Sequence, residues 1–238
     1  MGRLAAIGGG TFEETDPLNQ HIIKLSGKEK PNILFIGTAA EDSTNPLTSC
    51  KKSFKRVCPG VIVKKLSIIR SVYTEEETDE LLSWADIIYV GGGNTEFLVK
   101  KWTEYGLIPK LRKIFEEDSA VISGMSAGAI CWFTDGYTDS DMFGGREEWH
   151  YRLIRPGIDL YSAVFCPHYS DFGRHGFDEA IRETGKPGIA VDDCAAFVIS
   201  GEREYAVSSK EGAGVYRLDY ETGTLRKTAM DTEILQIC

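Results

Sequence analysis

The stretch VISGMSAGAICW, residues 121–132, places one hydroxyl group between small residues at the end of an apolar run. Continuous hydrophobicity over five or six residues is typical of a strand that is buried on both faces. Gly124 and Gly128 lie close to Ser126 on either side, and glycine permits a sharp turn that other residues resist. The stretch therefore predicts a parallel strand, a tight turn and then a helix.

Three further segments repeat this pattern of an apolar run followed by glycine: RLAAIGGG at 3–10, NILFIGTAA at 32–40 and ADIIYVGGGNT at 85–95. The chain between and after them predicts helices over 43–57, 75–83, 94–102 and 107–117. Strands that alternate with helices form a doubly wound, mostly parallel sheet with helices on both faces. Such sheets bind ligands beyond the carboxyl ends of their strands, where the glycine-bearing loops converge.

The C-terminal part of the chain has a different pattern. Residues 135–152 lack periodicity, and a loop of this length usually serves as a lid or a binding loop. The other predicted elements are a helix at 174–184 and strands at 162–167, 188–191, 195–200, 203–208 and 213–218. The last 40 residues predict an antiparallel extension, a meander with YETGTL as a hairpin turn. Because we find neither an internal repeat nor a linker, we predict a single α/β domain over residues 1–238.

The composition narrows the classes of partner. A formal net charge of -9 disfavours nucleic acid and anionic membranes, which repel an acidic chain. No apolar run approaches the length of a spanning helix, so we expect a cytoplasmic location. Six cysteines are scattered without a C-x-x-C pair, which is typical of reduced thiols in a cytosolic protein.

Residues 124–128 fit the G-x-S-x-G pattern of a nucleophile on a strand-to-helix turn. At such a turn the serine side chain projects from the sheet edge. The N–H of the following residue, here Ala127, then points toward a developing oxyanion. The pattern is only moderately specific, because glycines and a serine also form ordinary turns. Ser126 is therefore either a nucleophile or a small turn residue.

A serine nucleophile needs a base within hydrogen-bond reach, and histidine is the most frequent one. The chain has four histidines, His21, His150, His168 and His175. Among them, His168 directly follows the predicted strand 162–167 and projects from the same sheet edge as Ser126. We predict that His168 is the base.

The acid that orients this histidine remains open among Asp135, Asp171, Asp178, Asp192 and Asp193. Asp192 and Asp193 stand between two apolar runs, which places them at a strand end near the same edge. A pair of carboxylates at a turn is commonly no more than solvated turn chemistry. The chain order of serine, histidine and then acid also differs from the order in α/β-hydrolases.

The chain carries four distinctive motifs: YVGGGNT at 89–95, GMSAGA at 124–129, PHY at 167–169 and GIAVDD at 188–193. Together they resemble peptidase family S51, which holds aspartyl dipeptidase (dipeptidase E) and cyanophycinase. The resemblance implies a flavodoxin-like sheet related to class I glutamine amidotransferases, with serine in place of their cysteine. It implies Ser126 as nucleophile and His168 as general base. The third member, usually a glutamate, falls on Asp193, with Asp192 as its neighbour.

The resemblance also implies the groups that bind the substrate. Backbone N–H groups of Gly92 or Gly93 supply the second oxyanion donor beside Ala127, and Asn94 completes that motif. Aspartyl dipeptidases need a cation for the substrate carboxylate, and arginine donates two parallel hydrogen bonds to such a group. Arg174 is the first choice for this role and Arg146 the second.

These observations predict a serine exopeptidase that hydrolyses Asp-X dipeptides through an acyl-enzyme on Ser126, with no cofactor and no metal. We expect a small peptide substrate, no nucleic acid or membrane partner, and a monomer or homodimer. One alternative is a cyanophycinase-like β-aspartyl peptidase. The other is a non-catalytic protein that binds small molecules on the same fold.

Overall fold

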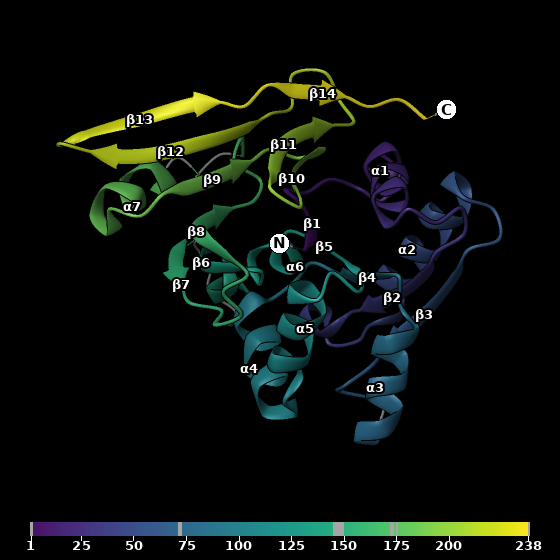
Figure 1. Cartoon of the computed structure of the whole chain (residues 1–238). Helices are drawn as coiled ribbons and strands as arrows, with labels where there is room; N and C mark the ends of the chain where they lie inside the picture. The colour runs from purple at the N-terminus through teal and green to yellow at the C-terminus, as the bar shows by residue number, and fades with distance from the viewer. Residues whose placement is uncertain (1, 71–72, 145–149, 172–173, 175, 238) are drawn as a thin grey trace.

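The computed structural model describes residues 2–70, 73–144, 150–171, 174 and 176–237. Its strands form two sheets, one of eight strands and one of six, which lie side by side (Figure 1). The larger sheet has the order β14-β11-β10-β1-β5-β4-β2-β3, and the smaller one has the order β13-β12-β9-β8-β6-β7.

The larger sheet has a parallel centre. Its five parallel strands are β1 (Arg3–Ile7), β5 (Val121–Met125), β4 (Ile87–Val90), β2 (Asn32–Ile36) and β3 (Ile62–Leu66). On the other side of β1 follow β10 (Ala195–Ser200), β11 (Arg203–Ser208) and β14 (Thr232–Ile234). β10 runs antiparallel to both β1 and β11, so the mostly parallel doubly wound sheet is confirmed together with its antiparallel extension.

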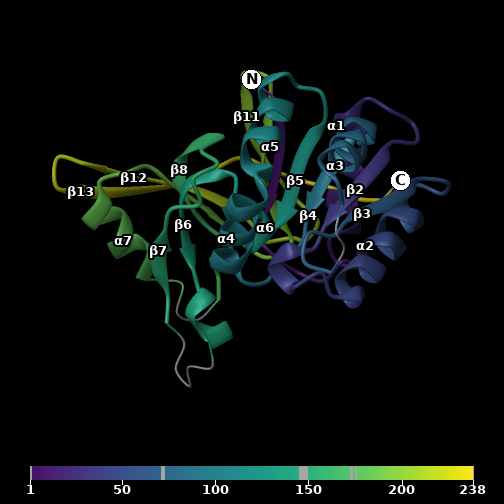
Figure 2. The same cartoon turned by 90° about the horizontal axis from the view of Figure 1, so that it is seen from below.

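Helices cover both faces of this sheet, which explains why its strands are continuously apolar. On one face lie α1 (Asp16–Ser26) and α2 (Thr44–Val57), against one side of the strands. On the other lie α3 (Glu75–Trp84), α4 (Thr95–Tyr105) and α5 (Leu107–Glu116), with the short α6 (Ala127–Ile130) beside α4 (Figure 2). In β4, for example, Ile87 and Tyr89 pack toward α1 and α2, whereas Ile88 and Val90 pack toward α3 to α5.

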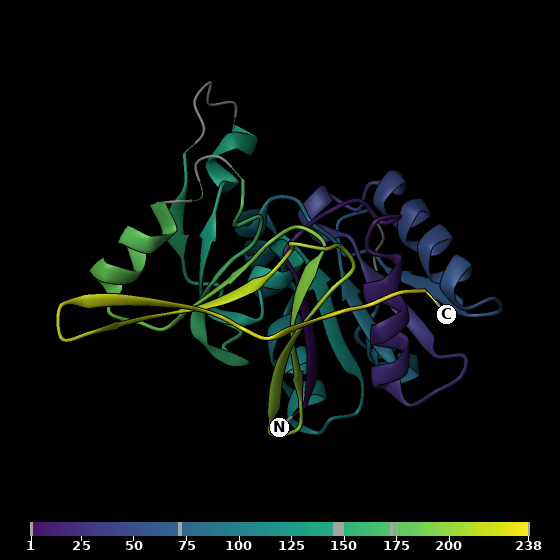
Figure 3. The same ribbon diagram turned by 90° about the horizontal axis from the view of Figure 1, so that it is seen from above.

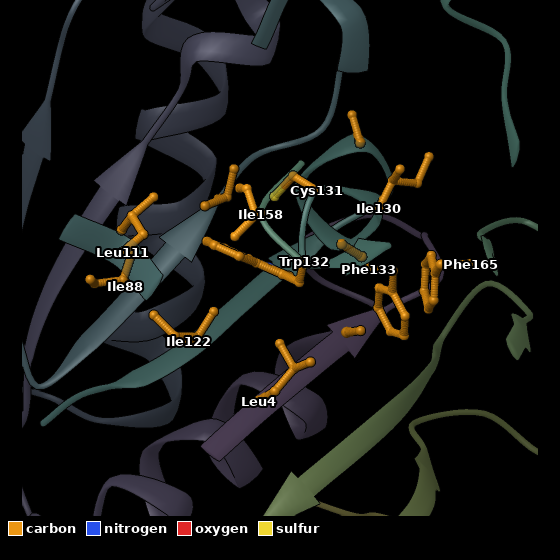
Figure 4. Packing of buried hydrophobic residues seen from close by; sticks show 14 of the residues in the cluster. Leu4, Ile88, Leu111, Ile122, Ile130, Cys131, Trp132, Phe133, Ile158 and Phe165 are labelled. Atoms are coloured by element: carbon orange, nitrogen blue, oxygen red, sulfur yellow. The ribbon is translucent and has the colours of Figure 1, made fainter. Parts of the chain in front are cut away.

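The second face has an aromatic core. Trp132 lies at its centre, next to Cys131, Phe133 and Ile158 (Figure 4). The rings of Trp132 and Trp102 are tilted against each other with their centroids 5.7 Å apart. Because this core also contains Phe133 and residues of the smaller sheet, it joins the two sheets into one apolar interior.

The smaller sheet carries the rest of the chain. It contains β6 (Phe133–Thr138), β7 (Arg152–Ile154), β8 (Tyr161–Cys166), β9 (Gly188–Val191), β12 (Val215–Glu221) and β13 (Thr224–Ala229). Helix α7 (Gly176–Thr184) packs on it through a separate apolar cluster. The β12–β13 hairpin extends away from the larger sheet, past α7 (Figure 3).

Most predicted elements are present, and two predictions are wrong. The capping box at the start of α3 is confirmed, since Thr74 and Glu77 each accept a hydrogen bond from the other's backbone N–H. The irregular loop at 135–152 instead contains strand residues of β6 and β7 and the short helix η2 (Ser140–Gly144). The C-terminal strands do not form one meander, because β9 and β12 belong to one sheet and β10 and β11 to the other. The single domain over residues 1–238 stays a prediction.

Close backbone contacts fix the turn after β5. A Cβ atom added at Gly124 would clash with the carbonyl of Gly128, and one added at Gly128 would clash with the carbonyl of Val90. α6 therefore lies directly on β4 and β5, nearer than any larger residue would allow. This contact places the loops after β4 and β5 against each other at the carboxyl edge of the sheet.

We predict that Gly128→Ala lowers the free energy of unfolding by about 3 kcal/mol, because the methyl group meets a backbone carbonyl that cannot move alone. Urea unfolding followed by circular dichroism measures this loss. Gly27→Ala is the control: its Cβ meets nothing within 4 Å, and its positive φ costs about 1 kcal/mol. Equal losses in the two variants would contradict the packing argument.

Candidate active site

Ser126 occupies a strained turn between β5 and α6. Its φ of 55° and ψ of -117° are rare for a residue with a side chain, and they lift the hydroxyl out of the line of the strand. Its N–H donates to the carbonyl of Ile7 at 3.1 Å, and its carbonyl accepts from Ala129 and Ile130 at 2.9 Å each. The backbone is therefore held on both sides of a strained residue, as a nucleophile on such a turn requires.

His168 approaches Ser126 from the smaller sheet. It lies two residues after β8 and also has a positive φ, of 52°. Its Nε2 lies 2.9 Å from Ser126 Oγ, and its Nδ1 lies 2.6 Å from Asp193 Oδ1. Since an ionised carboxylate can only accept, Nδ1–H donates to Asp193 and leaves Nε2 to accept the serine proton.

Asp193 stands in the connection from β9 to β10, where the chain crosses from one sheet to the other. Its pKa is lowered from 3.8, mainly by the hydrogen bond from His168 and further by the charge of that histidine. The more distant charges of Arg174 and Lys210 act in the same direction, whereas burial opposes them. The carboxylate therefore stays ionised at neutral pH and can hold the imidazole in one orientation.

The neighbouring Asp192 points elsewhere. Its Oδ2 accepts hydrogen bonds from Gly214 N–H at 3.0 Å and from the Tyr216 hydroxyl at 3.4 Å. The residue is 5% exposed. Of the two carboxylates that the sequence left open, the structure places Asp193 against His168 and Asp192 against the start of β12.

Gly9 is a site residue that the sequence reasoning missed. It pairs with Asp193 in an isolated parallel bridge, and a Cβ atom at this position would collide with both Asp193 Oδ1 and the ring of His168. Only glycine fits here, because any side chain would occupy the space of the His168–Asp193 contact. The signal was the glycine run directly after β1, Gly8 to Gly10.

The predicted oxyanion donors differ in position. Ala127 is the first residue of α6 and is 1% exposed, directly beside Ser126. A Cβ atom at Gly92 would lie 3.3 Å from Ser126 Cβ and 3.8 Å from its Oγ, so this glycine faces the hydroxyl. Gly93, with a φ of 138°, packs instead on the carbonyl of Ala39. Gly92 is thus better placed than Gly93 to contact a substrate carbonyl group bound next to the Ser126 hydroxyl.

The loop that bears Gly92 is held at both ends. Gly91 N–H donates to the carbonyl of Ile36 at 3.0 Å, and Asn94 N–H donates to the carbonyl of Ala39 at 2.8 Å. The side chain of Asn94, predicted to bind substrate, caps α4 by accepting from Phe97 N–H at 3.0 Å. This contact gives Asn94 a structural role that the sequence prediction did not include.

The predicted substrate cation, Arg174, is 2% exposed. Its guanidinium donates to the carbonyl of Tyr137 at 3.0 Å and to Asp139 Oδ2 at 3.2 Å, and it lies 4.4 Å from the centre of the Tyr151 ring. Its Nε has no hydrogen-bond partner among the described residues. The positive charge of Arg174 is therefore already paired with Asp139, whereas a cation that binds the substrate was expected to be accessible and unpaired. Arg146, the second choice, lies outside the described residues.

The described part of the chain offers no alternative centre for metal chemistry, since no three of its His, Cys, Asp and Glu side chains are grouped to hold an ion. Within the same ranges, no helix has the length and apolar character needed to cross a membrane. The thiol of Cys131, five residues after Ser126, is fully buried, and burial raises its pKa well above the ordinary value. It is a core residue and not a competing nucleophile.

Comparison with known proteins identifies the family of the chain. The model of peptidase family S51 matches residues 4–206. An uncharacterized peptidase, YgaJ of Bacillus subtilis (strain 168), is 34% identical over 228 residues, which cover 92% of both chains.

Two solved structures share the fold at 21% sequence identity. One is a putative peptidase E protein from Listeria monocytogenes EGD-e, with a TM-score of 0.62 over 88% of this chain and 100% of the other. The second is a peptidase from an acI-B1 Actinobacterium, with a TM-score of 0.67 over 96% of this chain and 97% of the other. By its family match and its relative in Bacillus subtilis, the chain belongs to peptidase family S51 and is a peptidase, and a serine nucleophile fits this family.

Proposed function

We propose that the protein is a cytoplasmic serine exopeptidase that hydrolyses dipeptides with an N-terminal aspartate through an acyl-enzyme on Ser126. One observation carries the proposal: an unbroken line of hydrogen bonds joins Asp193, His168 and Ser126. Each member follows a different strand, and two of them, Ser126 and His168, have unfavourable backbone conformations. A contact with a purely structural role does not require such conformations. The line ends at Ser126, which Gly92 faces and Ala127 follows, so we propose that the substrate carbonyl binds between them.

In the proposed reaction His168 Nε2 takes the proton of Ser126 as Oγ attacks the scissile carbonyl carbon. The oxyanion that forms accepts hydrogen bonds from the N–H groups of Ala127 and Gly92. His168 then gives its proton to the leaving amine as the C–N bond breaks. A water molecule releases the acyl group by the same two steps, and Ser126 regains its proton.

Specificity for aspartate is supported by Arg174, one of two cations, with Lys210, whose charges lower the pKa of Asp193. A substrate carboxylate must share or replace the contact of Arg174 with Asp139, because that guanidinium is already paired. The Tyr151 ring centre lies 4.4 Å from the guanidinium carbon, and the buried Nε has no hydrogen-bond partner among the described residues, so it could donate to a carboxylate that displaced Asp139. We therefore propose that the aspartate side chain binds by exchange with Asp139.

We expect wild-type protein to hydrolyse Asp-Leu and to leave Glu-Leu, Asn-Leu, Ala-Leu and isoaspartyl-Leu largely intact. Ser126→Ala abolishes turnover, a loss of roughly 10⁴-fold or more, because no other group replaces the nucleophile. Ser123→Ala is the matched control, since Ser123 lies on the same strand and its hydroxyl only binds the carbonyl of Ile88. Chromatography of the released amino acids measures the rates. Turnover that survives in Ser126→Ala would refute the assigned nucleophile.

Asp193→Asn should lower kcat by roughly 10³- to 10⁴-fold, because an amide in this position holds the wrong imidazole tautomer. Asp192→Asn removes the neighbouring carboxylate but keeps an oxygen acceptor for Gly214, so its kcat should stay within about threefold of wild type. Steady-state kinetics on Asp-Leu compare the two variants. The reverse ranking would assign Asp192 as the third member.

The pH profile should show one ionisation between pH 8 and 5. The lowered pKa of Asp193 keeps that carboxylate charged throughout this range, so its stabilising contact is lost only at more acidic pH, as the pH falls through that lowered value. A base must be neutral, so a histidine base loses its function when it gains a proton on the acid side. We expect kcat/KM to fall tenfold per pH unit on the acid side. A profile that stays flat from pH 8 to 5 would argue against a histidine base.

A further inference from the structure

We propose that the β12–β13 hairpin positions the general base and its acid. Tyr216 and Lys227 of the hairpin contact Asp192 and Tyr169, which are the neighbours of Asp193 and His168 in the chain. The inference rests on the proposed function, in which these two residues are the base and its orienting acid. The hairpin lies after residue 206, where the match to the family model ends.

The backbone of His168 needs outside support. Its φ of 52° lies in the left-handed region, where a residue with a side chain costs roughly 1–2 kcal/mol. Two backbone hydrogen bonds frame it, from Tyr169 N–H to the carbonyl of Val191 at 3.1 Å and from Asp171 N–H to the carbonyl of His168 at 2.9 Å. Both bonds involve only the backbone, so they do not restrain the imidazole ring. The side chain of the next residue, Tyr169, supplies a further restraint on this segment.

That side chain is held at both ends. The Tyr169 hydroxyl donates to Asp178 Oδ1 of α7 at 2.7 Å and accepts from Lys227 Nζ of β13 at 2.8 Å. Lys227 and Asp178 are themselves 3.7 Å apart. Burial and the hydrogen bond to Asp178 raise the pKa of Tyr169 well above its ordinary value, so the hydroxyl keeps its proton as a donor. Lys227, Asp178 and the Tyr169 hydroxyl therefore contact one another, and these contacts hold Tyr169, the residue that follows His168.

The acid is fixed from the same hairpin. Asp192 binds Gly214 twice, through its backbone N–H to the Gly214 carbonyl and through its side chain to the Gly214 N–H, both at 3.0 Å. Tyr216 of β12 adds its hydroxyl to the same carboxylate oxygen. Because consecutive side chains of an extended chain point in opposite directions, fixing Asp192 toward β12 turns Asp193 toward His168.

The contact of Lys227 with Tyr169 and the contact of Tyr216 with Asp192 lie on one face of the hairpin. The rings of Tyr216 and Tyr169 pack with their centroids 5.4 Å apart, and Leu218 joins the same cluster under α7. Lys227 pairs with Leu218 across the hairpin. The neighbouring Arg226 points to the other face and is exposed. A shift of the hairpin would therefore move the neighbours of the base and of the acid together.

The test compares Lys227→Met and Tyr169→Phe with Arg226→Met, which removes the same charge one residue away on the opposite face of β13. For the first two variants we expect kcat on Asp-Leu to fall about tenfold with KM within about twofold, because a displaced base slows chemistry more than binding. Lys227→Arg, which keeps the donor, should restore most of kcat. Arg226→Met should match wild type.

A second readout does not depend on turnover. The Nδ1–H shared by His168 and Asp193 should give a low-field proton NMR signal in wild type, which disappears in His168→Gln. We expect this signal to weaken or shift in Lys227→Met and Tyr169→Phe at temperatures where circular dichroism shows folded protein, and to be unchanged in Arg226→Met.

Unchanged kcat and an unchanged NMR signal in both hairpin variants would overturn the inference, as would equal effects in Arg226→Met. Failure of the proposed function looks different: wild type would neither hydrolyse a dipeptide nor react with a serine-directed phosphonate. In that case the NMR comparison alone decides whether the hairpin positions the His168–Asp193 pair.

Discussion

The whole site depends on two residues that are held in backbone conformations which side chains normally avoid. Ser126 has a φ of 55° and His168 a φ of 52°, and these turns bring Oγ and Nε2 to 2.9 Å. Each conformation is unfavourable alone and persists only where the contacts of the surrounding residues outweigh its energetic cost. Glycines supply that constraint at Gly124 and Gly128, where α6 rests on β4 and β5, and at Gly9, which leaves room for the His168–Asp193 contact.

The division into two sheets explains why the contact is possible. Ser126 ends a strand of the larger sheet, His168 follows a strand of the smaller one, and Asp193 lies where the chain crosses between them. The shared aromatic core around Trp132 and Phe133 fixes one sheet against the other. A relative movement of the sheets would therefore separate His168 from Ser126 before it disturbed either strand, so the stability of this core and the geometry of the site are linked.

The sequence was sufficient for β1, β2, β4 and β5, most of the helices and the placement of Ser126 beside His168, because buried runs and strand-end glycines are local signals. It missed β3 (Ile62–Leu66), in which only two of five residues are buried. It could not divide the C-terminal strands between two sheets, since pairing is a tertiary choice that similar alternating patterns do not encode. The pairing of Arg174 with Asp139 was missed for the same reason: these residues lie 35 positions apart and meet only after folding. Asp193 was separable from Asp192 only once the contact with Gly214 was known.

The two halves of the site are fixed by different means. On the side of Ser126 the constraints are backbone contacts, in which carbonyl groups and glycines leave no space for change. On the side of His168 they are side-chain contacts of Tyr169, Tyr216 and Lys227, reached through the neighbouring residues. Backbone packing is rigid, whereas hydrogen-bonded side chains can be adjusted one at a time. If substrate binding moves any part of this site, His168 and Asp193 are therefore the part with freedom to move, and Ser126 is the fixed point against which they close.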